Sequence, residues 1–204
     1  MHPIVYRKFV SLCQDLPLSG AVLEIGASPH HPTLLAMPSL HRAASRVGVG
    51  LDGNHDGNGY AIRHLNSHDL SVFADASFEL VLSNAMLEHD PHFWLTLREA
   101  YRVLAPGGWM VLGVPGFGGM GSVPGRQLWR GLAGASREAS ALADAMGASS
   151  LTLGVHNYPA DYYRFSEQAM RDVLLDGLVE LDISVIMQPP RVVGRGRKPK
   201  QAAG

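Results

Sequence analysis

Short apolar segments alternate along this chain with stretches in which apolar residues recur at helical spacing. The apolar segments predict buried strands over 21–26, 47–52, 61–65, 78–83, 109–114 and 179–187. Helices are predicted over 3–16, 32–45 and 167–175, and over a stretch that begins at Pro91 and stops before Pro106. Strands that alternate with helices indicate a parallel α/β sheet within one domain, residues 1–204.

Residues that favour helix ends support two of these helices. Asp90 is predicted to cap the helix that opens with Pro91, and Ser166 to cap the helix over 167–175. An apolar stripe along the first of these helices is expected to lie in the core. The stripe consists of Phe93, Trp94, Leu97, Tyr101 and Leu104.

Two segments depart from this alternation. Residues 54–59 have turn chemistry, so the crossover after the second strand is expected to be short or irregular. Residues 116–154 begin with glycines and continue as an alanine-rich stretch with helical periodicity. A lid over a substrate pocket and a surface helical excursion both fit this segment.

Acidic residues accompany the first two predicted strands at the positions where ligands collect in an open sheet. Glu24 and Gly26 stand at the end of the first strand, and Asp52 ends the second. Because ligands bind beyond the carboxyl ends of parallel strands, the first turn can cup a cofactor while Asp52 accepts hydrogen bonds from a ribose diol. The sequence therefore predicts a nucleoside-cofactor site.

Four motifs in order resemble the class I S-adenosylmethionine-dependent methyltransferases, specifically the small type 11 members. The motifs are Glu24-x-Gly26, Ser77-Phe78-Glu79-x-Val81, Leu87-Glu88-His89 and Arg102-Val103-Leu104-x-Pro106-Gly107-Gly108, and the resemblance runs from Val22 to Gly177. It implies a Rossmann-like, doubly wound, mostly parallel seven-stranded sheet with helices on both faces and an antiparallel last strand. The basic segment 191–204 is expected to supply that strand.

The resemblance also implies where S-adenosylmethionine binds. Asp52 would hold the ribose, Asn66 would lie beside the adenine, and Ser83 and Asn84 would border the sulfonium. The full predicted cofactor set is Glu24, Gly26, Ala27, Ser28, Asp52, Gly53, Asn66, Ser67, Ser83 and Asn84. The first loop departs from the family's Gly-x-Gly-x-Gly, because only Gly26 is retained and Pro29 removes a backbone donor.

The predicted reaction is methyl transfer to a hydroxyl or amine of a small molecule, such as a sugar or a natural-product precursor. A hydroxyl acceptor requires a base, and His89 and His156 are the candidates because histidine titrates near neutral pH. Structural roles for both remain open: His89 as a packing or capping residue, and His156 as part of a loop held by Asp161 and Arg164. The alternatives are a non-catalytic binding protein of this fold and, more weakly, an aminopropyl transferase.

Composition limits the other classes of function. No apolar run approaches the ~20 residues of a membrane span, and the lone Cys13 excludes an intrachain disulfide. We therefore expect a cytoplasmic protein without a membrane partner. Histidine pairs such as His30-His31 lack the cysteines or carboxylates of a tetrahedral site, so no metal is predicted. The oligomeric state is not indicated.

Charge is distributed unevenly, although the net charge is −1. Five basic residues and no acidic residue follow Pro190, which leaves −6 for residues 1–190. A basic end can attract nucleic acid, but this one has no aromatic residue to stack on bases. We expect a solvated edge strand with a frayed tail, and no nucleic-acid partner.

Overall fold

The computed structural model describes residues 1–119, 150–151, 160–187 and 189–200. Their main feature is an eight-stranded sheet in the order β3-β4-β2-β1-β5-β6-β10-β9. The strands are β1 (Ala21–Ile25), β2 (Ser45–Gly50), β3 (His55–Gly57), β4 (Tyr60–His64), β5 (Phe78–Asn84), β6 (Leu104–Pro115), β9 (Val179–Met187) and β10 (Pro190–Arg197). The pairs from β4 to β6 are parallel, whereas β10 runs antiparallel to both β6 and β9. The Rossmann-like fold with its antiparallel final strand is confirmed.

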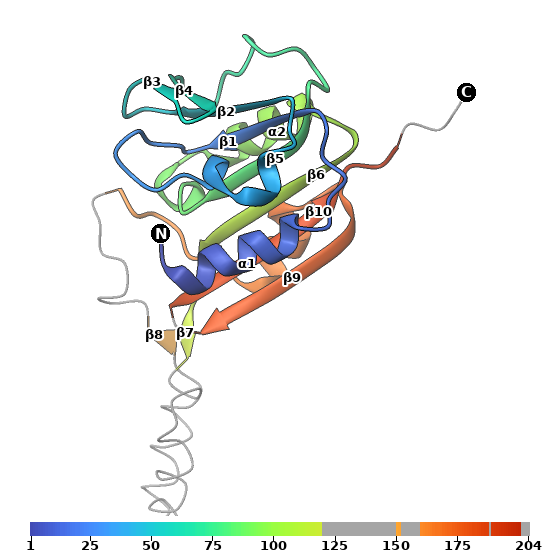
Figure 1. Ribbon diagram of the computed structural model, residues 1–204. Coiled ribbons are helices and arrows are strands. Elements are labelled where there is room, and N and C mark those ends of the chain that lie inside the picture. The colour runs from blue at the N-terminus through green and yellow to red at the C-terminus, as the bar shows by residue number, and fades with distance from the viewer. Residues whose placement is uncertain (120–149, 152–159, 188, 201–204) are drawn as a thin grey trace, which may run out of the picture.

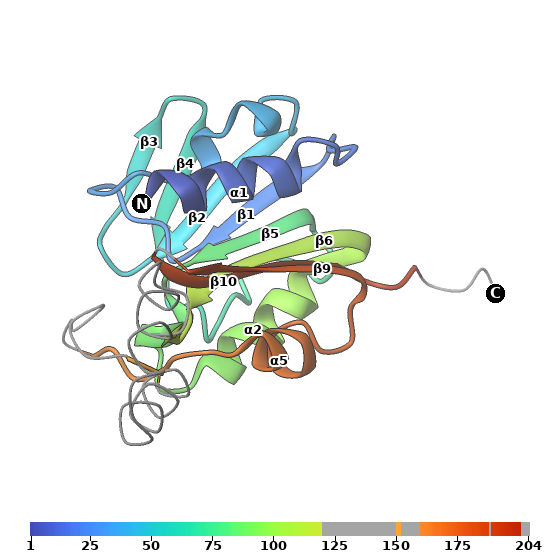
Figure 2. The same ribbon diagram turned by 90° about the horizontal axis from the view of Figure 1, so that it is seen from below.

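Helices cover both faces of this sheet. The helix α1 (Pro3–Cys13) lies on one face, and α2 (Phe93–Val103) with α5 (Glu167–Ala169) lies on the other (Figures 1 and 2). Each face has its own apolar core, and adjacent residues of β10 show the alternation: Val193 packs into the core beneath α1, whereas Val192 packs into the core on the opposite face. Successive side chains of a strand point to opposite faces, so two adjacent valines of β10 contribute to the two different cores.

The antiparallel direction of β10 has a consequence for the site. Arg191, near the start of β10, is paired with Pro115, the last residue of β6. The first residues of β10 therefore lie at the edge of the sheet where the parallel strands β1, β2, β5 and β6 end.

The prediction of an α-helix over 32–45 is wrong. This segment instead forms two 3₁₀ turns, η1 (Leu34–Ala36) and η2 (Pro38–Leu40). Pro38 lacks an amide hydrogen and restricts the preceding residue, so a continuous α-helix cannot pass through it. The amides of Leu34 and Leu35 donate instead to the carboxylate of Glu24.

The predicted start of α2 needs two corrections. The helix begins at Phe93, and its N-cap residue is His92, which makes no side-chain capping bond. Asp90 instead accepts hydrogen bonds from the His92 amide and the Thr96 hydroxyl. Trp94 does not lie in the core, because 52% of it is exposed. The other residues of the predicted stripe are buried or half-buried.

The predictions for the crossover after β2 and for the Ser166 cap are confirmed, whereas the helix after Ser166 is α-helical only in part. The short crossover after β2 is confirmed, and within it β3 pairs with β4 as an antiparallel edge hairpin, which makes eight strands instead of seven. The Ser166 cap is also confirmed, since its Oγ accepts from the Ala169 amide at 3.0 Å. The helix it starts is α-helical only over α5 and continues as a π-helical turn, η5 (Met170–Leu174).

Most of the predicted lid segment 116–154 lies outside the described residues. At its two ends, β7 (Gly118–Gly119) pairs with β8 (Ser150–Leu151). Among the residues that the structure describes, no helix has the length and apolar character that a membrane crossing requires.

Candidate functional site

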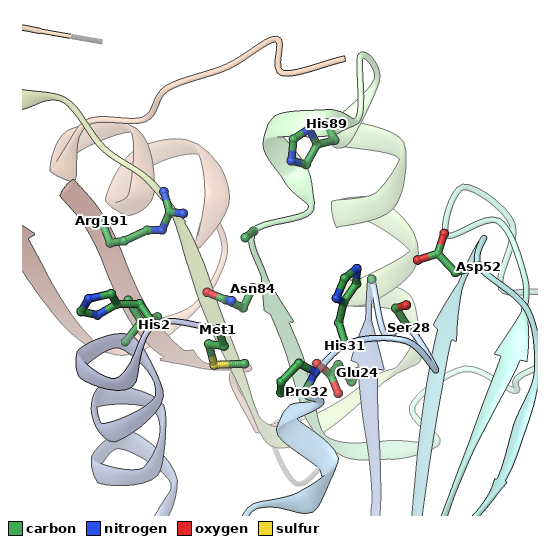
Figure 3. A pocket seen from close by; sticks show the side chains of 13 residues that line it. Met1, His2, Glu24, Ser28, His31, Pro32, Asp52, Asn84, His89 and Arg191 are labelled. Atoms are coloured by element: carbon green, nitrogen blue, oxygen red, sulfur yellow. The ribbon is translucent and has the colours of Figure 1, made fainter. Parts of the chain in front are cut away.

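Two adjoining cavities lie at the edge where the parallel strands end. The larger has a volume of about 710 Å³ and the smaller about 280 Å³. Four residues line both: Gly26, Asp52, Ala85 and His89. The two cavities therefore adjoin at the ends of β1, β2 and β5, and Figure 3 shows the lining of the larger one.

The turn after β1 is held tightly against β2. Gly26 has a φ of +85°, and the amides of Gly26 and Ala27 both donate to the Val49 carbonyl, at 2.8 and 3.0 Å. On β2, a Cβ added at Gly50 would lie 2.1 Å from the Ala27 carbonyl oxygen. Glycine at position 50 is therefore required for this close approach, which fixes the floor between the two cavities.

Glu24 borders the larger cavity but is hydrogen-bonded within the chain. Its carboxylate accepts hydrogen bonds from the Thr33 hydroxyl and from the Leu34 and Leu35 amides. Burial raises the pKa of Glu24, and these three donors oppose that rise. The described contacts make Glu24 the residue that orders the turn η1 beside the cavity.

Asp52 lies on the rim shared by the cavities. It is exposed, only Leu51 separates it from the end of β2, and its carboxylate points toward the larger cavity (Figure 3). On the wall of the smaller cavity, the Asn66 side-chain carbonyl accepts from the His68 amide at 3.0 Å. The hydroxyl of Ser67 bonds to that of Thr96 at 2.8 Å, so both side chains have fixed positions.

The end of β5 presents polar atoms without hydrogen bonds in the described part of the chain. The Oδ1 atom of Asn84 and the Oγ atom of Ser83 are both buried and unpartnered there. Asn84 lines the larger cavity, whereas Ser83 is buried and lines neither cavity. An unsatisfied buried acceptor favours a ligand that can donate to it, so Asn84 is a ligand-facing group.

His89 ends the 3₁₀ turn η3 (Leu87–His89) directly beyond β5. Its Nδ1 lies 3.1 Å from the carbonyl oxygen of Ala160. A carbonyl can only accept, so this bond selects the tautomer with the proton on Nδ1 and the lone pair on Nε2. A histidine in that tautomer on a cavity wall can act as a base.

Glu88, the neighbour of His89, carries the most perturbed carboxyl group near the site. It is fully buried, and burial raises its pKa to about 7, against the opposing fields of Arg191 and Arg164. Neither of its carboxylate oxygens is hydrogen-bonded to another residue that the structure describes. Desolvation without compensating donors is the physical cause of this rise.

The structure thus places most of the predicted site residues together. Those that line one or both cavities are Glu24, Gly26, Ala27, Ser28, Asp52, Asn66, Ser67, Asn84 and His89. Gly53 and Ser83 line neither cavity, and His156 lies outside the described residues.

Sequence reasoning did not place seven of the residues that line the larger cavity: Met1, His2, Val5, His31, Pro32, Ala85 and Arg191. The predicted antiparallel last strand contained the signal for Arg191, because the start of such a strand lies beside the ends of the parallel ones. The N-terminal residues carry no motif, and only packing of α1 against the sheet brings them to the cavity.

The described residues contain no group of three or more histidines, cysteines or carboxylates positioned to hold a metal ion.

A family model for the methyltransferase domain matches residues 40–112, which include β2, β5 and α2. This part of the chain is thus similar in sequence to the methyltransferase domain. No curated protein matches the chain in sequence. The resemblance that the four motifs indicated is confirmed by the family match and by the fold.

Solved structures share the fold of this chain at low sequence identity. Phosphoethanolamine N-methyltransferase 2 of Haemonchus contortus, in complex with S-adenosyl-L-methionine, has a TM-score of 0.60 at 12% identity over 97% of this chain. The match covers 53% of that protein, so the chain spans about half its length. The N-methyltransferase NodS of Bradyrhizobium japonicum has a TM-score of 0.56 at 13% identity, over 97% of this chain and 96% of its own.

A third similar structure comes from a complex. The putative methyltransferase of Haloferax volcanii, bound to the Trm112 methyltransferase activator, has a TM-score of 0.59 at 17% identity. The match covers 95% of this chain and 89% of that one. Identities this low establish a common fold, and the function of this chain has to be argued from its own site.

Proposed function

We propose that this protein transfers the methyl group of S-adenosylmethionine to a hydroxyl or amine of a small molecule. The observation that carries the proposal is the pair of adjoining cavities at the ends of β1, β2 and β5, which share Asp52 and His89 in their walls. The smaller cavity has the lining expected for an adenine, and the larger has room for the rest of the cofactor and an acceptor.

The described residues fit the cofactor. Val49, Leu51, Leu65 and Met86 supply apolar walls to the smaller cavity, and Asn66 and Ser67 supply polar groups. The exposed carboxylate of Asp52 would accept from the ribose hydroxyls. The unpartnered Oδ1 of Asn84 would accept from the amino group of the methionine moiety. We assign Glu24 the ordering of the adjacent turn, Gly26, Ala27 and Ser28 a backbone wall, and Gly53 and Ser83 supporting positions.

When bound, the cofactor supplies a methyl group that its sulfonium already activates. The chain must then orient the acceptor in line, exclude competing water and remove a proton where the acceptor is a hydroxyl. His89 is proposed to take that proton, because it lines both cavities beside the end of β5. An amine that is unprotonated at the working pH needs no base before transfer.

A panel of small hydroxyl and amine compounds tests this proposal by mass spectrometry of the products. We expect a product that is heavier by one methylene unit for at least one acceptor, and loss of that product in Asp52→Ala. A protein that binds the cofactor and yet methylates no member of a broad panel would favour the non-catalytic alternative.

A further inference from the structure

The basic residues at the end of the chain differ in what they contact. Arg195 donates to the Leu12 carbonyl at 2.7 Å, and Arg197 bonds to the Gly107 carbonyl and to Glu180, both at 3.0 Å. The ammonium of Lys198 donates to the Tyr101 and Leu104 carbonyls, both at 2.7 Å. These three cations are therefore used to attach β10 and its tail to the rest of the fold.

Arg191 is the one arginine of β10 whose side chain makes no hydrogen bond or ion pair in the described part of the chain. Its Nη1 is buried and unpartnered there. The Nε of Arg195 is also buried without a hydrogen bond, but that guanidinium is held by the Leu12 carbonyl. Burial lowers its pKa, and the nearby charges of Glu88 and Asp161 oppose that effect. Burial of a guanidinium nitrogen without a hydrogen-bond acceptor costs free energy. This cost indicates that a bound ligand supplies the hydrogen-bond acceptor for Nη1.

The position of Arg191 in the larger cavity indicates which ligand would supply that hydrogen-bond acceptor. Arg191 lines the larger cavity together with Asn84, and Figure 3 shows it on the opposite side of the cavity from Asp52. Asp52 marks the proposed ribose side. The Arg191 side of the cavity is therefore the part left for the methyl acceptor.

The two carboxylates near Arg191, those of Asp161 and Glu88, do not accept a hydrogen bond from its guanidinium among the described contacts. Asp161 forms an ion pair with Arg164, at 2.5 and 2.6 Å between its two oxygens and the two guanidinium nitrogens. Glu88 acts on Arg191 through its field, and no ion pair joins them among the described contacts. The guanidinium thus keeps donors in the fork geometry that matches a carboxylate or phosphate.

We propose that Arg191 forms an oxyanion subsite of the acceptor pocket, which selects methyl acceptors that carry a carboxylate or phosphate group. The assignment rests on the proposed methyltransferase function, because it takes the rest of the larger cavity as the cofactor's place. It narrows the acceptor class from any small hydroxyl or amine compound to anionic ones.

Calorimetry on the full chain saturated with S-adenosylhomocysteine tests the subsite with three probes that share a phenyl ring. The probes are benzoate, phenyl phosphate and the neutral benzamide. We expect at least one anion to bind about tenfold or more tightly than benzamide, since charge-assisted bonds to a guanidinium are lost in the neutral probe. Whichever anion binds more tightly identifies the oxyanion, and equal binding of all three would overturn the proposal.

Matched variants separate recognition from structure. Arg191→Gln should abolish the preference for the anion, and Arg191→Lys should keep part of it. Arg63→Gln removes the same charge at the exposed ion pair with Asp56 on the β3–β4 edge, and should leave the preference unchanged. Glu88→Gln should retain or strengthen anion binding. If Arg191 served only to balance Glu88, the preference would persist in Arg191→Gln, which would overturn the assignment.

The calorimetric results distinguish failure of the proposed function from failure of the Arg191 subsite. If the wild type does not bind S-adenosylhomocysteine, the proposed function fails and the subsite fails with it. If S-adenosylhomocysteine binds and no anion is preferred, only the subsite is wrong.

Discussion

The Nδ1 atom of His89 lies 3.1 Å from the carbonyl oxygen of Ala160, which joins the end of β5 to the segment that leads into α5. Ala160 has a φ of +67°, a conformation that alanine rarely adopts. The bond thus sets the tautomer of the cavity histidine and ties together two segments that are 71 residues apart.

Replacement of His89 tests its role as base. His89→Gln should lower kcat by roughly 10² to 10⁴ for a hydroxyl acceptor and leave the affinity for S-adenosylhomocysteine nearly unchanged. His41→Gln, at an exposed position after η2, is the control and should change neither. Full turnover of a hydroxyl acceptor by His89→Gln would contradict the role of His89 as the base. His156 would then be the remaining candidate.

Glu88 should make stability depend on pH in a direction opposite to that of most carboxylates. Its pKa is raised from 4.5 to about 7 in the folded protein, so the folded state keeps a proton that the unfolded state has lost. The free energy of unfolding therefore falls as pH rises through this window. Between pH 5 and 8, the wild type should lose roughly 2 to 3 kcal/mol relative to Glu88→Gln.

Urea unfolding at both pH values measures this difference, and Glu79→Gln is the matched control. The Gly20 and Ser19 amides lower the pKa of Glu79, so its contribution is lost only below pH 5. The difference between the wild type and Glu79→Gln should be nearly flat from pH 5 to 8. A flat difference for Glu88→Gln as well would show that Glu88 is not desolvated as described.

The turn that separates the cavities should tolerate no side chain at Gly50. In Gly50→Ala the new Cβ would meet the Ala27 carbonyl oxygen at 2.1 Å, so β2 and the turn must move apart. We expect a loss of about 1 to 3 kcal/mol in the free energy of unfolding, together with weaker binding of S-adenosylhomocysteine. Gly116→Ala, whose Cβ would first meet a Val192 methyl group at 3.3 Å, should cost less. Equal costs at the two positions would contradict the close approach.

The fold was largely predictable because its strands are short, apolar and followed by turns, and this local pattern survives packing. The helix predicted over 32–45 failed for a tertiary reason: the carboxylate of Glu24 binds the Leu34 and Leu35 amides and stabilises a 3₁₀ turn. Spacing alone could not show that Trp94 points outward, since α2 has both a buried and an exposed face.

The candidate site was predictable where a residue follows a strand, as with Asp52 and Asn84. It was not predictable at Met1, His2 and Arg191, which reach the larger cavity through packing of the first and last elements of the chain. Glu88 was visible only as part of a motif, because its perturbed pKa arises from burial that no local pattern encodes.

Calorimetric titration of S-adenosylhomocysteine into the wild type and Asp52→Ala measures whether this edge of the sheet binds the cofactor. We expect the wild type to bind, and Asp52→Ala to bind about 10 to 1000-fold more weakly, because two charge-assisted hydrogen bonds worth roughly 2 to 4 kcal/mol are lost. Asp56→Asn, at an exposed carboxylate on β3, should bind like the wild type. No binding by the wild type, or equal binding by Asp52→Ala, would contradict the assignment of this edge of the sheet as the cofactor site.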